Sequence, residues 1–446
     1  MGTINTIILG AAGRDFHNFL VYFKDNPEYE VKAFTAEQIP GIANREFPRE
    51  LSGPKYPNGI KIYPESDLPR LINELQVELA VFSYSDLSNS EIMDRASRVL
   101  ACGANFMLLN PEFTMLKSTK PVVSICAVRT GAGKSTVARK VSTYLRDGGA
   151  EVVIVRHPMP YGNLKRQAVQ RFESHSDLDK YECTIEEREE YEPHIDNGFI
   201  VFAGVDYKTI LEKAEKEADV ILWDGGNNDL PFIKSDLHIV VADPLRPGHE
   251  IDYYHGELNV RAADLLVINK VRSAYPESVN VVYQNLKRLN PDAVIIKTAS
   301  RIIVDGPDLI RGKRVLVIED GPTVTHGQMA FGAGTVAARE FGAKEIVDPR
   351  AFAVGSLKKI YKKYPHLDKV LPSMGYGHKQ IRELEETINR TECDTVLFGN
   401  SIDLRRIMKI QKPALKIRFE LEEIGGNRLV NTLETFMREN SISDKG

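Results

Sequence analysis

Short apolar runs alternate with amphipathic stretches along most of the chain, and this alternation predicts strands separated by helices. Runs such as Val122–Ala127, Val220–Trp223 and Leu265–Ile268 are almost continuously apolar, as strands buried on both faces require. The stretches Thr136–Arg146 and His378–Asn389 carry the apolar spacing that is typical of amphipathic helices. Repeated strand–helix order favours an α/β fold in which helices cover both faces of a mostly parallel sheet.

Two breaks in this pattern divide the chain. Prolines and small polar residues gather near residues 110–120, just before a fresh apolar strand, and glycine and proline cluster again near residues 300–313. We therefore expect three domains, over residues 1–118, 119–300 and 301–446. The glutamate-rich segment 173–196 has little apolar periodicity. We interpret it as an insertion or lid over a site, with an exposed acidic helix as the alternative.

Composition narrows the class of protein. The 446 residues include 58 Lys plus Arg and 62 Asp plus Glu, a formal net charge of −4, which argues against a basic coat for nucleic acid. No run approaches the roughly 18 apolar residues of a membrane span, and the N-terminus lacks the features of a signal peptide. The four cysteines are far apart, with no Cys-x-x-Cys pair, so neither a disulfide framework nor a zinc site is indicated. We expect a cytoplasmic protein without nucleic-acid or membrane partners.

The strongest motif follows the apolar run 122–127. Val128-Arg129-Thr130-Gly131-Ala132-Gly133-Lys134-Ser135-Thr136 leads from a strand through a glycine-rich turn into a helix, the context of a P-loop. The glycines leave room for backbone N–H groups to surround a phosphate, the lysine charge reaches the β- and γ-phosphates, and the serine hydroxyl binds Mg²⁺. The predicted nucleotide-binding residues of this loop are Gly131, Ala132, Gly133, Lys134, Ser135 and Thr136.

The loop departs from the common pattern at two positions. Val128 stands where the first glycine usually lies. Arg129 stands where the deviant Walker class places a second lysine, whose charge reaches a nucleotide, often across a dimer. Arg129 is therefore a candidate catalytic residue beside Lys134.

A magnesium-binding acid is predicted at the end of a second strand. Four apolar residues, Val220 to Trp223, lead into Asp224-Gly225-Gly226, which is the Walker B pattern. Asp224 is predicted to hold Mg²⁺ together with Ser135, directly or through water. A helix N-cap is the structural alternative for Asp224. Asn227, Asn228 and Asp229 follow at once and could position a water or a substrate.

A third strand end bears on the nucleotide base. Asn269-Lys270 after the run 265–268 resembles the start of the guanine-reading Asn-Lys-x-Asp motif, but Arg272 replaces its aspartate. That carboxylate would read the guanine N1 and N2 hydrogens, so its absence favours ATP over GTP. Asn269 can still bond an adenine edge, and we predict that Asn269 and Lys270 take part in nucleotide binding.

Basic and polar residues follow three more predicted strands. In open α/β sheets, ligands gather beyond the carboxyl ends of the strands, and arginine recognises phosphate or carboxylate through two parallel bonds. The candidates for binding an anionic substrate are Arg156, His157, Arg246 and His249, and His326 is a further candidate catalytic residue. A solvated surface role is the alternative for any one of them. No closely spaced pair among the histidines supports a metal site.

The N-terminal strand runs into the turn Gly10–Gly13. Glycines at a strand-to-helix turn allow a phosphate to approach the backbone, but this Gly-x-x-Gly is only part of the dinucleotide fingerprint, and no acidic residue ends the second strand. Ligand binding and a tight packing turn both stay open here. The three domains are thus predicted as a Rossmann-like N-terminal domain, a P-loop nucleotide-binding domain and a C-terminal α/β region that completes the substrate site.

Three motifs together carry a resemblance to a known family. They are Trp223-Asp224-Gly225-Gly226-Asn227-Asn228-Asp229, Asp243-Pro244-Leu245-Arg246-Pro247-Gly248-His249-Glu250 and Glu319-Asp320-Gly321-Pro322-Thr323-Val324-Thr325-His326-Gly327. With them, most of the chain resembles the cyclic 2,3-diphosphoglycerate synthetase family, many of whose members are labelled predicted GTPases. The resemblance implies ATP-dependent closure of an intramolecular phosphoanhydride in 2,3-diphosphoglycerate, with release of ADP and phosphate. It also implies Mg²⁺ dependence, a homodimer and a cytosolic location.

The mechanism expected from this resemblance is phosphoryl transfer. Lys134 and Mg²⁺ neutralise the charge that develops on the γ-phosphoryl group, and one substrate phosphate attacks it before the second displaces inorganic phosphate. Arg156, Arg246 and His249 would hold the polyanionic substrate, and His326 would stabilise the leaving phosphate.

Other functions are compatible with the same motifs. The scaffold could serve another ligase or kinase acting on a different small anion. A nucleotide-switched chaperone or maturation factor is a second alternative, although a metallochaperone would need a Cys or His cluster that the sequence lacks. A dinucleotide-dependent oxidoreductase rests on Gly10 to Gly13 alone. Turnover stimulated by a substrate favours an enzyme, and turnover stimulated by a partner favours a switch.

Overall fold

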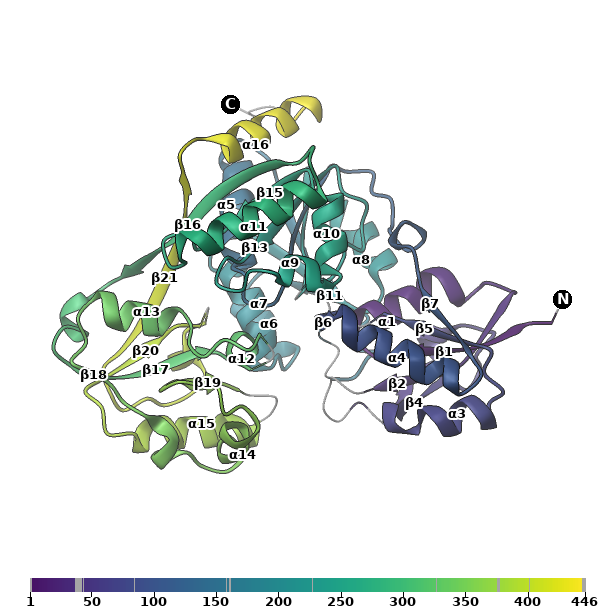
Figure 1. The fold of residues 1–446 in the computed structure, drawn as a ribbon, viewed down its shortest axis with the longest axis horizontal. Helices are drawn as coiled ribbons and strands as arrows, with labels where there is room; N and C mark the ends of the chain where they lie inside the picture. The colour runs from purple at the N-terminus through teal and green to yellow at the C-terminus, as the bar shows by residue number, and fades with distance from the viewer. Residues whose placement is uncertain are drawn as a thin grey trace.

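The structure is a computed structural model that describes residues 2–36, 42, 44–83, 85–157, 159, 162–226, 228–325, 327–374, 378–400 and 402–442. Figure 1 shows three lobes in a row: an N-terminal lobe at one side, a central lobe, and a C-terminal lobe at the other side. Among the described residues, no helix has both the length and the apolar character needed to cross a membrane.

The N-terminal lobe is built on its own sheet, which is parallel except at one edge. Its strands, in spatial order, are β3 (Glu46–Phe47), β4 (Ile60–Pro64), β2 (Tyr29–Ala36), β1 (Ile4–Leu9), β5 (Leu79–Phe82) and β7 (Asn105–Leu108). Its helices are α1 (Gly13–Asn18), α2 (Arg49–Ser52), α3 (Leu68–Glu74) and α4 (Asn89–Ala101). The strand order and the turn after β1 are those of a Rossmann-like domain, which confirms that part of the predicted fold.

A second and longer sheet runs through the central lobe into the C-terminal lobe. The strands of the central lobe, in spatial order, are β10 (Val169–Phe172), β11 (Ile200–Gly204), β9 (Val152–Arg156), β12 (Val220–Asp224), β8 (Val122–Ala127), β13 (Leu237–Ala242) and β15 (Leu265–Ile268). Its helices are α5 (Lys134–Asp147), α6 (His175–Lys180), α7 (Ile185–Ile195), α8 (Tyr207–Ala214), α9 (His249–Asp252), α10 (Gly256–Ala262) and α11 (Pro276–Leu289). Apart from β10, neighbouring strands here are parallel, as predicted.

The strand β8 shows why the central sheet is buried on both faces. Val123 and Ile125 point into one apolar core, which α5, α7 and the C-terminal helix cover. Val122 and Cys126 point into a second core on the opposite face, beneath α8, α10 and α11. Alternate residues of a strand face opposite sides of the sheet, so each strand must be apolar almost throughout.

Two long antiparallel strands join the central and C-terminal lobes. They are β16 (Val294–Val304) and β21 (Ala414–Ile424), which pair from Lys297 with Ile424 to Val304 with Ile417. The sheet continues beyond them through β20 (Thr395–Phe398), β17 (Arg314–Asp320) and β18 (Glu345–Ile346), and β19 (Leu371–Ser373) also pairs with β17. The helices of this lobe are α12 (Gly321–Val324), α13 (Ala333–Glu340), α14 (Ser356–Lys363) and α15 (His378–Arg390).

The last helix returns to the central lobe. Helix α16 (Arg428–Glu439) places Leu429, Leu433 and Phe436 in the core that contains residues of α5, and Figure 1 shows it at the top of that lobe. At the other side, the short strands β6 (Leu87–Ser88) and β14 (Tyr253–Tyr254) pair between the N-terminal and central lobes. The predicted division at residue 300 falls within β16, and the three-domain division stays a prediction.

Candidate functional site

The glycine-rich turn lies between β8 and α5, at the carboxyl end of the central sheet. Gly131 and Gly133 have φ angles of +80° and +97°, a region that side chains with a Cβ rarely adopt. Gly133 is the N-cap of α5, and Lys134 is the first residue of that helix. The turn therefore presents its backbone and Lys134 at the edge of the sheet, as the P-loop motif predicts.

Asn269 and Lys270 support this turn from the end of β15. The buried Asn269 donates its amide Nδ2 to the carbonyl oxygen of Ala132 at 3.1 Å, and its Oδ1 accepts from Thr298 at 3.1 Å. Lys270 Nζ bonds the carbonyl oxygen of Gly131 and lies 3.0 Å from Asp243 Oδ2. Both side chains thus brace the P-loop, and their predicted contact with a nucleotide base stays a prediction.

We expect Gly133→Ala to weaken nucleotide binding and to destabilise the fold. A Cβ at Gly133 would lie 2.2 Å from Asn269 Nδ2, and the positive φ alone costs about 1–2 kcal/mol. Nucleotide affinity, measured by titration calorimetry, should fall by about tenfold or more, which corresponds to about 1.4 kcal/mol.

Gly198→Ala is the matched control, because Gly198 has φ +79° with open space around its Cβ position. This variant should lose stability without losing nucleotide affinity. Equal nucleotide affinity in the two variants would contradict the placement of the nucleotide against this turn.

Asp224, at the end of β12, is the centre of a buried ionic cluster. Lys134 Nζ donates to its Oδ1 at 2.5 Å, Arg156 Nη1 lies 2.9 Å from the same oxygen, and His194 Nε2 lies 2.9 Å from Oδ2. Burial alone would raise the pKa of Asp224, but the charges of Arg156 and Lys134 outweigh it and hold the pKa well below its usual range. Asp224 is therefore ionised at neutral pH.

Burial also shifts the pKa values of the two basic side chains Lys134 and His194 in this cluster. Burial, with the neighbouring charge of Arg156, lowers the pKa of Lys134 to about 8. Burial also lowers the pKa of His194, although Asp224 opposes that shift. When a nucleotide phosphate arrives, Lys134 can exchange one anionic partner for another at little electrostatic cost.

Sequence reasoning did not find His194, which lies on α7 within the glutamate-rich segment. That segment forms α6 and α7, and α7 is buried, with Glu186, Glu189 and Glu192 among its buried residues. The exposed acidic helix that was the alternative is therefore wrong for α7. The apolar residues Tyr191 and Ile195 of α7 pack in the core of the central lobe, and Arg406 of the C-terminal lobe pairs with Glu192.

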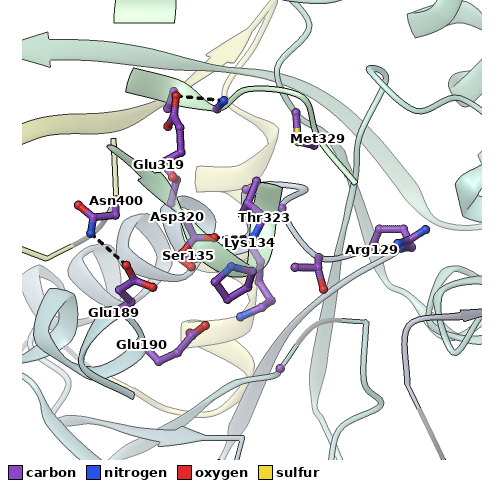
Figure 2. Close-up of a pocket in the computed structure, with 18 of the residues that line it drawn as sticks. Arg129, Lys134, Ser135, Glu189, Glu190, Glu319, Asp320, Thr323, Met329 and Asn400 are labelled. Atoms are coloured by element: carbon purple, nitrogen blue, oxygen red, sulfur yellow. Dashed lines mark hydrogen bonds between the residues drawn. The ribbon is translucent and has the colours of Figure 1, made fainter. Parts of the chain in front are cut away.

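A cavity of about 2180 Å³ opens in front of the P-loop and reaches all three lobes. Figure 2 shows Lys134 and Ser135 on one side of it, with Glu189, Glu190, Asp320 and Thr323 around the same space. The predicted P-loop residues Gly131, Gly133, Lys134, Ser135 and Thr136 all line this cavity. Ala132 is buried behind them.

Several of the carboxylates in the cavity wall come from distant segments. Glu189 of α7 accepts hydrogen bonds from Ser373 at 2.7 Å and from Asn400 at 3.0 Å, as Figure 2 shows for Asn400. Burial and the charge of Asp320 raise the pKa of Glu189 well above its usual value. Glu319 accepts from the backbone of Gly332, Gly334 and Thr335, which fixes the start of α13.

Each of the predicted substrate-binding residues has a partner within the chain. Arg156 pairs with Asp224 and with Glu190, and it donates to the carbonyl oxygens of Asp224 and Gly225. His157 lies 3.1 Å from Asp229, and both line the cavity. Arg246 pairs with Asp243 at 2.9 Å and donates to the carbonyl oxygens of Thr130 and Gly327. Arg156 and His157 line the cavity, whereas Arg246 and His249 are not among the described residues that line it, and the binding of an anionic substrate by these four side chains stays a prediction.

Arg129 and His249 lie together between the P-loop and the N-terminal lobe. Arg129 pairs with Asp86 at 2.6 Å and lies over the ring of Tyr253 at 3.7 Å. Its Nη1 lies 3.2 Å from His249 Nδ1. Burial, with the charges of Arg129 and Arg246, lowers the pKa of His249 to about 4. Arg129 lines the cavity, and its predicted contact with a nucleotide stays a prediction.

Two residues of interest, His326 and Asn227, lie outside the described residues. Within the described part of the chain, no group of three or more His, Cys, Asp or Glu side chains could hold a metal ion by itself. A magnesium ion in a P-loop site takes few protein ligands and is otherwise held by phosphate and water. Ser135 lines the cavity, whereas both oxygens of Asp224 are paired with Lys134, Arg156 and His194, so the magnesium contacts of Ser135 and Asp224 stay predictions.

The chain is similar to several known proteins. A family model described as cyclic 2,3-diphosphoglycerate synthetase, P-loop domain, matches residues 197–299. The chain is 59% identical over 432 residues to arginine synthetase ArcE of Thermococcus kodakarensis, covering 97% of this chain and 96% of that protein. It is 22% identical over 284 residues to the cyclic 2,3-diphosphoglycerate synthetase of Pyrococcus furiosus, covering 56% and 65% of the two chains. The crystal structure of LpxK from Aquifex aeolicus in complex with ATP covers 78% of this chain and 95% of its own at 13% identity, with a TM-score of 0.43.

The fold and the strand–turn–helix site define an α/β P-loop nucleotide-binding protein, which confirms the predicted fold class. The chain belongs to the cyclic 2,3-diphosphoglycerate synthetase family, of which arginine synthetase ArcE is a related member. The predicted family is thereby confirmed. Membership supports an ATP-dependent ligase activity, whereas the particular reaction differs between the named relatives.

Proposed function

We propose that this protein is an ATP- and Mg²⁺-dependent synthetase that forms arginine from a ureido amino acid and a nitrogen nucleophile. The observation that carries the proposal is the 59% identity to arginine synthetase ArcE over 97% of the chain. The matches to cyclic 2,3-diphosphoglycerate synthetases are weaker, at 22% identity and 65% of the relative's length for the Pyrococcus furiosus protein. The cyclisation of 2,3-diphosphoglycerate becomes the second candidate.

The charges around the P-loop favour the first candidate. A substrate with two phosphates needs several cations that are not already neutralised. Arg156, Arg246 and His157 each have a carboxylate partner instead. The cavity wall also carries Glu189, Glu190 and Asp320 (Figure 2). Glu190 pairs with Arg156, and burial raises the pKa of Glu189, so Asp320 is the acidic side chain of these three that we propose faces an ammonium or guanidinium group of the substrate.

The chemistry follows from what a P-loop does. The oxygen of a ureido group is a poor leaving group until a phosphoryl group is placed on it. In the proposed reaction, Lys134 holds the γ-phosphoryl group of ATP while the ureido oxygen attacks it and ADP leaves. The nitrogen nucleophile then adds to the ureido carbon, and inorganic phosphate departs with the former ureido oxygen. When bound by Ser135 and Asp224, Mg²⁺ would neutralise phosphate charge during the first step.

The second candidate keeps support from the family model, which spans Asp224 and Asn269. In that reaction, an ionised phosphate of 2,3-diphosphoglycerate would be the nucleophile, and the second phosphate would close the ring. The same P-loop chemistry serves both reactions. The two candidates differ in the acceptor and in the group that then displaces phosphate, so one experiment separates them.

The test is to incubate the full chain with ATP and Mg²⁺ in parallel reactions. One contains citrulline, the amino acid that carries a ureido group in place of the guanidinium of arginine, together with ammonium chloride. The other contains 2,3-diphosphoglycerate. Arginine and ADP are measured by chromatography, and organophosphates by phosphorus NMR. We expect arginine in equal amount to ADP in the first reaction. A cyclic pyrophosphate signal in the second, without arginine in the first, would move the assignment to cyclic 2,3-diphosphoglycerate synthesis.

A further inference from the structure

The cavity in front of the P-loop extends to the N-terminal lobe. There it reaches the turn Gly10–Gly13, for which the sequence is compatible with either ligand binding or tight packing. Ala11, Ala12 and Asp15 of this turn and of α1 line the cavity, as do His157 and Asp229 of the central lobe. Figure 1 shows α1 and the N-terminal lobe beside the central lobe. Residues about 215 positions apart in the chain therefore form one end of the cavity.

Asp229 anchors this end of the cavity through ionic contacts with three basic side chains. Arg14 Nε lies 3.0 Å from its Oδ1, His157 Nδ1 lies 3.1 Å from its Oδ2, and His255 Nδ1 lies 3.6 Å from Oδ1. Burial opposes its ionisation, but the charge of Arg14 and the bond to His157 keep the pKa of Asp229 well below its usual value. Asp229 therefore stays charged and neutralises Arg14.

The two carboxylate oxygens of Asp15, on α1 beside Arg14, have different surroundings. It is 2% exposed, and its Oδ2 accepts a hydrogen bond from the backbone N–H of Ala12 at 2.8 Å. Its Oδ1 is buried, and no partner for it exists among the described residues. A buried acceptor without a donor costs about 1–3 kcal/mol. The oxygen is thus placed to receive a hydrogen-bond donor from a ligand in the cavity.

The ligand at this place is not a phosphate. The carboxylate of Asp15 lies over Gly10, where a Cβ would be 2.2 Å from the Asp15 Cγ and Oδ1 atoms. It fills the space beside the glycine turn that a dinucleotide pyrophosphate would use. The charge of Arg14 is already committed to Asp229. A small molecule with N–H donors and a positive charge fits the acceptors that this end of the cavity presents.

We propose that Asp15 binds the nitrogen nucleophile of the reaction, as ammonium or a primary ammonium group, at the end of the cavity between the N-terminal and central lobes. This inference rests on the proposed function, because that reaction requires a nucleophile beside the activated ureido carbon. The network Lys134–Asp224–Arg156 and the adjacent His157–Asp229–Arg14 contacts connect the subsite to the P-loop through neighbouring residues.

The subsite also accounts for the proton that the nucleophile must lose. The ionised carboxylate of Asp15 takes one proton from the ammonium, which frees its lone pair. The nitrogen then bonds to the ureido carbon as the bond from carbon to the phosphorylated oxygen breaks, and phosphate leaves with that electron pair. Burial raises the pKa of Asp15 to about 8, with the charge of Asp229 adding to the rise and Arg14 opposing it. The ionised form of Asp15 therefore predominates only above about pH 8, and the proton transfer should become faster as the pH rises through that value.

The experiment compares wild type with Asp15→Asn, and with Asp25→Asn as a control on an exposed residue of the same lobe. The amide that replaces the Asp15 carboxylate keeps an oxygen for the Ala12 N–H. In Asp15→Asn, kcat/KM for ammonium should fall by about 10²-fold or more, while KM for ATP stays unchanged. The ratio of wild-type to variant activity should rise as pH increases through about 8, where Asp15 ionises. Asp229, Arg14, His157 and His255 stay unchanged in this comparison.

A second measurement uses wild-type protein, so it does not depend on the folding of a variant. Crystals of the full chain are soaked in rubidium chloride, whose cation approximates ammonium in size and scatters anomalously. A peak beside Asp15 is expected. Arginine formation with the same kcat/KM for ammonium in Asp15→Asn would overturn the subsite and leave the proposed function standing. A rubidium peak at Asp15 without any arginine formation would keep the cation subsite and overturn the proposed function. If neither a rubidium peak at Asp15 nor arginine formation is observed, the subsite and the proposed function are both overturned.

Discussion

Lys134→Ala is expected to reduce nucleotide turnover by about 10²–10³-fold, the cost of removing one positioned charge from a developing transition state. Lys134 is buried, begins α5 and reaches Asp224 at 2.5 Å, so its ammonium lies where the phosphates of a P-loop nucleotide are held. Phosphate release from ATP measures the effect, with acceptor and nucleophile present.

The fold should survive this replacement. Asp224 keeps Arg156 at 2.9 Å and His194 at 2.9 Å when Lys134 is gone, so no buried carboxylate is left without a partner. Lys117→Ala, at an exposed position before β8, is the matched control and should leave turnover unchanged. Wild-type turnover in Lys134→Ala, with a normal melting temperature, would remove the P-loop from the reaction.

Asp224→Asn is expected to affect both turnover and stability. Its charge compensates Lys134 and Arg156 within 3 Å, and leaving two buried cations without a counter-charge costs about 3–5 kcal/mol. The melting temperature should fall clearly at pH 7, measured by scanning calorimetry. Turnover should also fall by about 10²-fold, because the proposed magnesium ligand is lost.

The pH dependence of this stability has a definite sign. The pKa of Asp224 is held below its usual value of 3.8 in the folded state, so its contribution is present above that value and is lost as pH falls below it. The stability difference between wild type and Asp224→Asn should therefore shrink as pH is lowered through about 4. Asp147→Asn, whose side chain is 63% exposed, is the control and should change stability by less than about 0.5 kcal/mol. A melting temperature at pH 7 equal to wild type would contradict the ionic cluster around Asp224.

The elements that carry the P-loop were predicted closely. The strand Val122–Ala127 was predicted with the bounds of β8, and Leu265–Ile268 with those of β15. The helix predicted over Thr136–Arg146 is α5, Lys134–Asp147. These elements are buried in the middle of a parallel sheet, where local apolar pattern and tertiary environment require the same residues.

The connection to the C-terminal lobe was predicted less well. The strand β16 continues to Val304, into the break predicted near residues 300–313, and its partner β21 was not predicted. The signal for β21 was present, since Leu415, Ile417, Phe419 and Leu421 alternate with polar residues. Such period-two alternation is typical of a strand with one buried face. The glycine and proline residues near 306–312 were interpreted as a break in the chain, and β16 ends just before them.

What the sequence by itself determined was the P-loop, its lysine and the aspartate that faces it, together with the family. A P-loop is local: a strand, a turn and a helix of about fifteen consecutive residues hold its geometry, so the motif can be read without the rest of the chain. The tertiary structure alone decided which charged side chains lie around the P-loop and its cavity. Glu189 on α7 and Asp15 on α1 line the cavity from separate segments, and Glu189 meets Asn400 across 211 residues of sequence. Burial and ion pairing depend on contacts between such distant segments, and those contacts set whether a charged residue binds a substrate or supports the protein itself.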